Sequence, residues 1–167
     1  MILSQILHDQ SVLTPLESRT RSGVFEEMAK LIVASGRIKD PKAVRKAFES
    51  REKTGPTAVG KGVAIPHART DKLDTMVAAI GIAPAGLDWP TPDGEPVRIV
   101  VALAGPAGRP AEHLKALSHT AGLLRKEDVR KKLVEVPTTY DLLQYLREIE
   151  GTEAGPRAST TPVSGDF

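Results

Sequence analysis

Two nearly continuous apolar runs, residues 76–83 and 97–103, constrain this chain more than any other feature. A strand with one face in water alternates apolar and polar residues, whereas a strand that is apolar at nearly every position must be covered on both faces. The segment between the runs includes Thr-Pro-Asp-Gly at 91–94, which is a turn signal. The runs therefore predict two strands that are buried on both sides.

Helical patterns lie before and after these runs. Residues 20–35 repeat apolar side chains at the helical period, and Gly36 follows as a cap. Asp40 and Pro41 form the N-cap and first-turn pair of a second helix. Because helices flank the strands in sequence, we expect an α/β fold: a single domain with a mixed central β-sheet and helices on both faces. Three further helices are expected at residues 110–125, 127–134 and 138–149.

Two shorter strands are also expected. Residues 11–16 predict a strand near an edge, because Pro15 cannot donate to a ladder. Residues 63–65 predict a strand that ends at Pro66, which would place His67 in a loop at the strand end, beside the glycine-rich segment 53–62.

The end of the chain differs in composition from the rest. Residues 151–167 are rich in Gly, Pro, Ser and Thr and have no apolar periodicity, so we predict a disordered tail. Residues 1–150 would then form the one domain. With 167 residues in all, a domain of this size can bury a stable core without a metal or a disulfide.

Composition excludes several classes of protein. The chain has no cysteine, which rules out disulfides, thiolate nucleophiles and zinc sites built on sulfur. Lys and Arg number 23 against 21 Asp and Glu, an excess too small to argue for a nucleic-acid partner. No apolar stretch approaches the roughly 20 residues that a bilayer requires, and the N-terminus lacks a secretory signal. We expect a cytoplasmic protein without direct membrane insertion. The sequence does not determine its oligomeric state.

Four histidines are the candidates for chemistry. His8 lies in a polar setting, and His119 is expected on the solvent side of its helix, opposite an apolar stripe of Leu114, Leu117, Ala121 and Leu124. His113 lies at the border of that stripe, near the helix N-terminus. His67 follows a strand and lies near Arg69. The plain alternatives are that His67 is a loop residue without a role and that the His113 ring only covers the core.

Several familiar activities do not fit. Residues 55–62, GPTAVGKG, resemble a P-loop, but Gly62 replaces the hydroxyl that would hold magnesium, which disfavours nucleotide binding. No Gly-x-Ser-x-Gly motif marks a serine hydrolase. His113 and His119 are six residues apart and cannot hold one zinc ion from one helix. We expect no metal site and no cofactor.

Phosphoryl transfer through a histidine is the one reaction that would use the histidines, the glycine-rich segment and the neighbouring arginine together. A neutral imidazole is a good nucleophile near pH 7, and the transition state needs positioning and cationic or N–H stabilisation of three phosphoryl oxygens. The glycine-rich segment with Gly60 and Gly62 would supply N–H groups, Thr57 a hydroxyl, and Arg51 a guanidinium. A second imidazole would complete the site.

The chain resembles the enzyme IIA domains of the mannitol/fructose class of the bacterial phosphotransferase system, which includes nitrogen-regulatory members. The resemblance rests on residues 51–69, REKTGPTAVGKGVAIPHAR, and extends through GLDW at 86–89, DGEPV at 93–97 and HLKALS at 113–118. Ala58 departs from the glycine of many members, which affects only local loop geometry.

The resemblance implies a role for each candidate. His67 would be phosphorylated by the histidine-containing phosphocarrier protein and would pass the group to a cysteine of a IIB domain. His113 and Arg51 would stabilise the phosphoryl group, with Thr57, Gly60, Gly62 and Arg69 around it. Without cysteine in this chain, the acceptor would be a separate IIB component, or the protein would act on a regulatory target. A non-catalytic interaction module of the same fold is the alternative.

Overall fold

The two apolar runs form the centre of the sheet. In the computed structural model, which describes residues 3–153, β5 and β6 pair antiparallel from Val77 opposite Ala104 to Leu87 opposite Val97. The sheet has six strands in the order β1-β5-β6-β3-β2, and β4 also pairs with β6. The strands are β1 (Leu7–Leu13), β2 (Ala58–Gly60), β3 (Val63–Ala64), β4 (His67–Thr70), β5 (Val77–Leu87) and β6 (Val97–Pro106).

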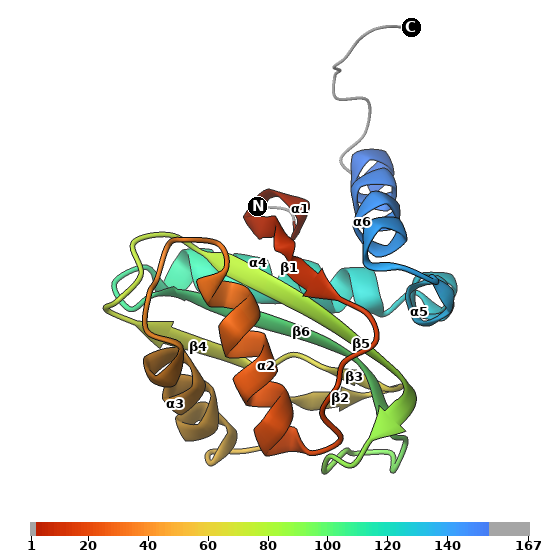
Figure 1. Cartoon of the computed structure of the whole chain (residues 1–167), viewed down its shortest axis with the longest axis horizontal. Coiled ribbons are helices and arrows are strands. Elements are labelled where there is room, and N and C mark those ends of the chain that lie inside the picture. Colours follow the sequence, from red (N-terminus) through yellow and green to blue (C-terminus); the bar gives the residue numbers. More distant parts are fainter. Residues whose placement is uncertain (1–2, 154–167) are drawn as a thin grey trace, which may run out of the picture.

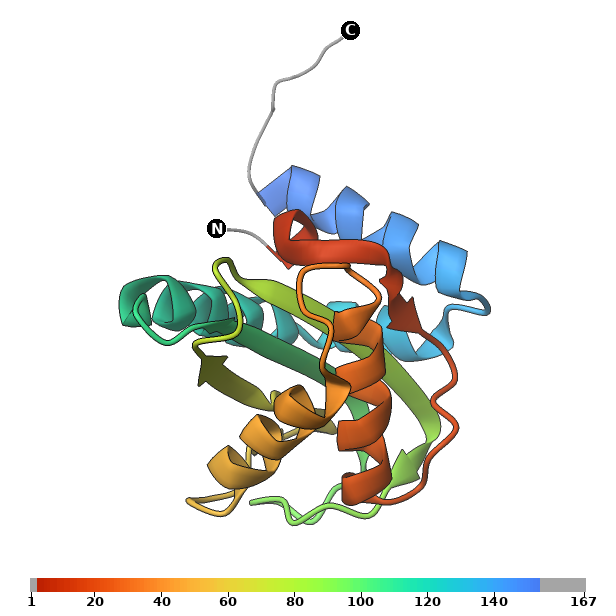
Figure 2. The same ribbon diagram turned by 60° about the vertical axis from the view of Figure 1, so that its left-hand side comes forward.

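The sheet is mixed because β1, β3 and β4 join it in parallel, whereas the β5–β6 and β2–β3 pairs are antiparallel. Helices lie on both of its faces, as the sequence predicts (Figures 1 and 2). The helices are α1 (Leu3–Ile6), α2 (Arg21–Val33), α3 (Pro41–Glu52), α4 (Pro110–Leu124), α5 (Glu127–Glu135) and α6 (Thr139–Glu153).

Strand β6 divides the core in two. Val100 and Ala102 face a cluster formed with α2 and α3. Val101 and Leu103 point the other way, into a cluster formed with α1, α4, α5 and α6. Successive strand residues point to opposite faces, so a strand between two helical layers needs apolar residues at both parities. The prediction of a strand covered on both sides is confirmed.

Local signals place the starts of α2 and α3 as expected. The Thr20 hydroxyl accepts a hydrogen bond from the Gly23 amide at 3.1 Å. The Asp40 carboxylate accepts from the amides of Lys42 and Ala43, and Pro41 occupies the first helical position. Such caps satisfy amides that have no partner within the helix.

Four element boundaries differ from the sequence prediction. Strand β1 ends at Leu13, before Pro15, so it covers less of residues 11–16 than predicted. Strand β5 continues past Pro84 to Leu87. His67 is the first residue of β4 and not part of a loop, because β4 resumes the pairing with β6 directly after Pro66. Helix α6 runs to Glu153, past its predicted end at residue 149; the predicted disordered tail lies mostly in residues 154–167, outside the described residues.

The apolar face of α4 is also rotated from the prediction. Leu114, predicted in the stripe, is 62% exposed, whereas Ala116 and Thr120 are buried. Thr120 tolerates burial because its hydroxyl donates to the Ala116 carbonyl at 2.8 Å. Ala116 packs into the cluster beneath α4, whereas Leu114 lies on the side of the helix that lines a surface pocket.

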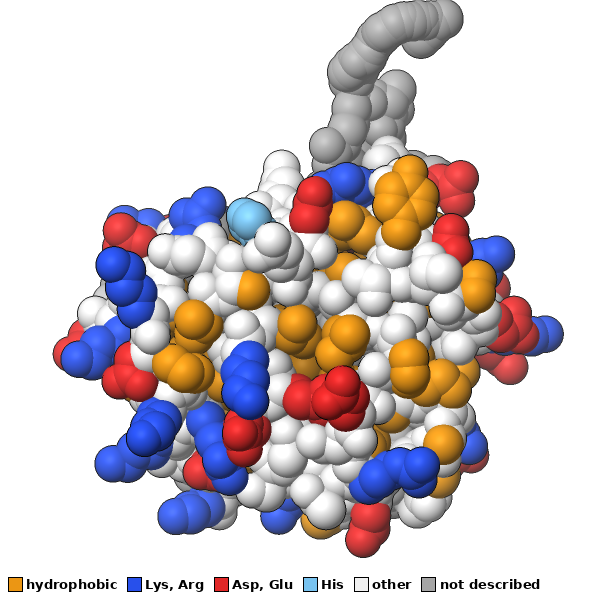
Figure 3. Space-filling view, viewed as in Figure 1, with side chains coloured by type: hydrophobic (Ala, Val, Ile, Leu, Met, Phe, Trp, Pro, Cys, Tyr) orange, Lys and Arg blue, Asp and Glu red, His pale blue; other side chains and the backbone are white. Residues whose placement is uncertain are grey.

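Charged side chains of both signs surround the face of the molecule shown in Figure 3. Figure 3 shows Lys and Arg side chains, with acidic ones interspersed, over the end at which α3 lies in Figure 1. Most apolar side chains on this face occur in small separate groups.

A close approach in β5 requires glycine. A Cβ atom at Gly81 would overlap the side chain of Leu16, which is buried and whose amide donates to Ile82 at 2.7 Å. We therefore expect Gly81→Ala to lower the free energy of unfolding by about 1–3 kcal/mol.

Gly108→Ala is the matched control, since no atom outside the adjoining residues lies within 4 Å of its Cβ position. Urea unfolding would measure both, and Leu16→Ala should relieve part of the Gly81→Ala cost. Strictly additive effects in the double variant would contradict this packing.

Candidate active site

A pocket of about 670 Å³ lies where α3, β4 and α4 meet. Arg51 reaches it from the last turn of α3, His67 and Arg69 from β4, and His113 from α4. Strand β4 explains part of this grouping: Ala68 packs into the α2–α3 cluster, so its neighbours His67 and Arg69 point to the other side. The pocket thus brings together four of the residues that the sequence singles out.

The ring of His67 is held in one orientation. Its Nδ1 atom lies 2.8 Å from the carbonyl oxygen of Ile65. A carbonyl can only accept, so Nδ1 carries the proton and donates it, which leaves the lone pair on Nε2. Burial lowers the pKa of His67, and the Arg51 charge lowers it further, against the Ile65 hydrogen bond and the Glu52 charge, which raise it. His67 is therefore a neutral imidazole with a free Nε2 near pH 7.

His113 faces His67 from the first turn of α4. The two ring centroids are 5.4 Å apart. His113 is 9% exposed, and its Nδ1 atom makes no hydrogen bond to the described residues. Burial lowers its pKa to about 4, with contributions from the charges of His67 and Arg69. Two facing imidazoles that are both neutral do not repel each other.

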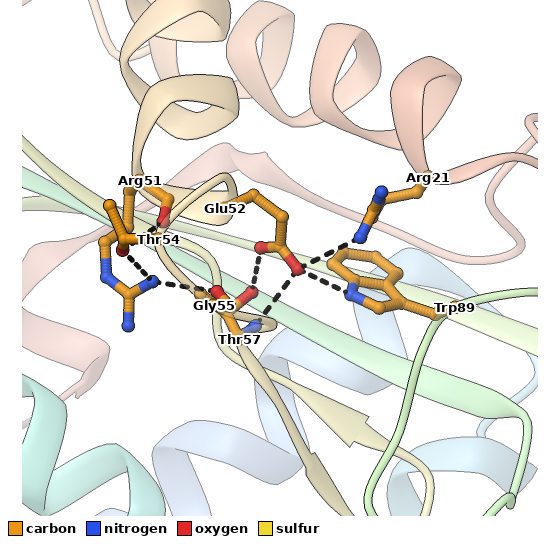
Figure 4. A network of polar contacts seen from close by, with 7 residues as sticks. All are labelled: Arg21, Arg51, Glu52, Thr54, Gly55, Thr57 and Trp89. Atoms are coloured by element: carbon orange, nitrogen blue, oxygen red, sulfur yellow. Dashed lines mark hydrogen bonds and ion pairs between the residues drawn. The ribbon is translucent and has the colours of Figure 1, made fainter.

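The remaining charges in the pocket are positive. Arg51 Nη1 donates to the Gly55 carbonyl at 2.9 Å and to the Thr54 hydroxyl at 3.1 Å (Figure 4). Arg69 is exposed at the pocket. No carboxylate is among the described residues that line it. Two guanidinium groups without a carboxylate favour an anion, and guanidinium geometry matches phosphate oxygens.

Three expected site residues lie elsewhere. Thr57, Gly60 and Gly62 do not line this pocket. Thr57 is buried, and its hydroxyl donates to Glu52 Oε1 at 2.6 Å. Gly60 and Gly62, with φ values of +94° and +79°, shape the β2–β3 turn. The turn lies against the segment of Asp93, whose carboxylate accepts from the Lys61 amide at 2.7 Å. This position gives no support to the expectation that these residues cradle a phosphoryl group, which stays a prediction.

His119 also differs from its prediction. It is partly buried, and its Nε2 lies 2.6 Å from Oε2 of Glu150, which is fully buried. The same carboxylate accepts from the backbone amides of Leu3 and Ser4. His119 therefore joins α4 to α6 and α1, and it is not in the pocket with His113.

Glu52, the neighbour of Arg51, was not among the residues expected from the sequence. Glu52 is buried at 8% exposure, and its Oε2 accepts from the Thr57 amide and from Trp89 Nε1, both at 3.0 Å. Arg21 Nη1 lies 3.5 Å from the same oxygen. Figure 4 shows the Arg51 and Glu52 side chains leaving α3 in opposite directions. A charged residue at a helix end ordinarily predicts solvent, so only its place within the REKTG segment could have signalled it.

Within residues 3–153, no group of three His, Asp or Glu residues could hold a metal ion. No helix among these residues is both long and apolar enough to cross a membrane.

The fold and its pocket of two histidines and two arginines belong to a chain that matches a known class of phosphotransferase proteins. The family model described as "Phosphoenolpyruvate-dependent sugar phosphotransferase system, EIIA 2" matches residues 5–149, and the chain belongs to this family. The resemblance seen in the sequence is thereby confirmed, together with the α/β fold.

Individual relatives carry two kinds of name. The chain is 36% identical over 134 residues to a nitrogen regulatory protein of Bradyrhizobium diazoefficiens, covering 80% of this chain and 86% of that one. It is 30% identical over 148 residues to the PTS system fructose-specific EIIABC component of Bacillus subtilis, covering 89% of this chain but only 23% of that relative. The crystal structure of nitrogen regulatory protein IIA-Ntr from Neisseria meningitidis is similar at a TM-score of 0.79 and 28% identity, covering 86% of this chain and 97% of that one.

Burial of His113 makes stability depend on pH. Its folded-state pKa of about 4 lies below the ordinary value of 6.5, so the unfolded chain binds the proton more tightly. Stability from this group is present above pH 6.5 and is lost as the pH falls toward 4. We expect the free energy of unfolding to fall over this range by about 3 kcal/mol more in wild type than in His113→Gln. Urea titrations at several pH values would measure this difference, and parallel profiles would contradict the buried neutral imidazole.

Proposed function

We propose that the protein is a histidine phosphocarrier that accepts a phosphoryl group on Nε2 of His67 from the histidine-containing phosphocarrier protein. One observation carries the proposal: Nδ1 of His67 is occupied by the Ile65 carbonyl, so the free lone pair lies on Nε2, on a residue that lines a pocket with two arginines.

The chemistry follows from these groups. The Nε2 lone pair attacks phosphorus, and the P–N bond of the donor phosphohistidine breaks, its electron pair returning to the donor imidazole. The Nδ1 proton stays on the ring, where the Ile65 carbonyl stabilises the developing positive charge. Arg51 and Arg69 offset the charge on the three equatorial oxygens. His113, neutral and 5.4 Å from His67 between ring centroids, donates to one of these oxygens.

The destination of the phosphoryl group depends on the role. In sugar uptake, a cysteine thiolate of a IIB component would take it, since these 167 residues themselves contain no cysteine. In regulation, the phosphorylation state would alter binding to a target protein. The fructose-specific name of one relative supports the first role, and the nitrogen-regulatory name of another supports the second.

Phosphorylation of His67 can be tested directly. Incubation with enzyme I, the phosphocarrier protein and labelled phosphoenolpyruvate should place one acid-labile, base-stable phosphoryl group on the wild-type chain. His67→Ala should take up none, because it lacks the attacking nitrogen. His8→Ala is the control, since His8 is exposed and does not line the pocket. Equal labelling of His67→Ala and wild type would overturn the assignment to His67, and a wild type that takes up no label would favour a non-catalytic interaction module.

The two histidines of α4 should behave differently. A charge-assisted hydrogen bond is worth about 1.5–3 kcal/mol, so His113→Ala should slow transfer to His67 by roughly ten- to a hundredfold. His119→Ala should lower stability, because the buried Glu150 carboxylate loses one of its three partners, but it should leave the transfer rate of the folded protein nearly unchanged. Single-turnover rates and unfolding curves of both variants would show this. A slower His119→Ala than His113→Ala would refute the assignment.

A further inference from the structure

The buried carboxylate of Glu52 lies on the opposite side of α3 from the pocket, yet it connects to two pocket residues. Thr57 is the junction. It donates to Glu52 through its hydroxyl at 2.6 Å and through its amide at 3.0 Å. These two hydrogen bonds join the first and last residues of the segment 52–57, and both bonds are buried.

The first connection leads to Arg51. Its guanidinium rests on the Thr54 hydroxyl and the Gly55 carbonyl, both within the 52–57 segment (Figure 4). The amides of Thr54 and Gly55 bond back to the carbonyls of Arg51 and Glu52. The position of this segment therefore sets where the guanidinium lies, and the Thr57–Glu52 contact closes the segment.

The second connection leads to His67. The carbonyl of Thr57 accepts from the Ile65 amide at 3.0 Å. The carbonyl of the same Ile65 accepts from His67 Nδ1 at 2.8 Å. A continuous hydrogen-bonded path thus runs from the Glu52 carboxylate through Thr57 and Ile65 to the imidazole ring.

We propose that Glu52, acting through Thr57, is the positioning residue that holds both the Arg51 guanidinium and the His67 ring in place for phosphoryl transfer. This inference rests on the proposed function of His67. Glu52 touches neither the pocket nor the phosphoryl group. The other partners of the carboxylate, Trp89 and Arg21, fix it within the fold and have no such path to the pocket.

Four variants separate positioning from general stability. Thr57→Val keeps the shape of the side chain and removes the hydroxyl, whereas Thr57→Ser keeps the hydroxyl. Glu52→Gln keeps the shape and presents an amide NH₂ to donors that need an acceptor. Trp89→Phe removes one bond to Glu52 outside the path. Circular dichroism and urea unfolding would report whether each variant folds and how stable it is.

Single-turnover transfer from the labelled phosphocarrier protein is the first readout. A small misplacement of reacting groups costs up to about a hundredfold in rate. We expect Thr57→Val and Glu52→Gln to be slower than wild type by about ten- to a hundredfold, Thr57→Ser to recover most of the rate, and Trp89→Phe to lose stability with little change in rate.

Nitrogen NMR of the His67 ring is the second readout, and it requires no phosphate donor. Wild type should show the proton on Nδ1, and both Thr57→Val and Glu52→Gln should shift population to the Nε2-protonated tautomer. Glu52→Gln should also move the His67 titration to lower pH, because the Glu52 charge raises the pKa of His67. Loss of stability alone would leave the tautomer and the titration midpoint of the folded protein unchanged.

The outcomes separate the two proposals. A wild-type chain that takes up no phosphate refutes the proposed function, whatever the variants do. A labelled wild type, with Thr57→Val as fast as wild type and an unchanged His67 tautomer, overturns the positioning role alone. If Glu52→Gln does not fold, the Thr57→Val and Thr57→Ser pair still decides, since rescue by serine with loss by valine supports the path and equal rates refute it.

Discussion

Burial of β6 on both faces and pairing along both edges is the constraint on which the structure depends. One edge of β6 carries β5, and the other carries first β3 and then β4. An apolar strand in this position requires a helical layer above and below, which α2 with α3 and the remaining helices provide. The site arises at the second edge, where the pairing with β6 is interrupted between β3 and β4.

That interruption provides the acceptor for the His67 ring. Residues 65 and 66 lie between β3 and β4, outside both strands, although Pro66 still accepts from Leu103 at 2.9 Å. The Ile65 carbonyl accepts from His67 Nδ1, while the Ile65 amide binds the Thr57 carbonyl next to the β2–β3 pair. The backbone at this break thereby selects one tautomer of the His67 ring.

Charge is separated across the end of α3. Arg51 lies at a pocket in which the described lining residues include no carboxylate, whereas the adjacent Glu52 is buried among donors on the far side. Burial of a carboxylate is tolerated when hydrogen bonds replace its hydration, and Glu52 accepts from an amide, a hydroxyl and an indole. Adjacent residues of opposite charge thus keep the pocket cationic without leaving the acid unsatisfied.

The sequence by itself determined the buried strands, the capped helices, the α/β class and, through the resemblance of residues 51–69, the candidates Arg51 and His67. These follow from local information: apolar period, cap chemistry and a contiguous motif. Tertiary structure alone decided that His113 is buried while Leu114 is exposed, that Thr57 serves Glu52 and does not line the pocket, and that His119 binds Glu150. The physical reason is that a buried donor binds whichever acceptor the packing of the chain places beside it. Glu52 and Trp89 are 37 residues apart in the sequence, and Glu150 and Leu3 are 147 residues apart. No pattern within a single helix or loop records such partners.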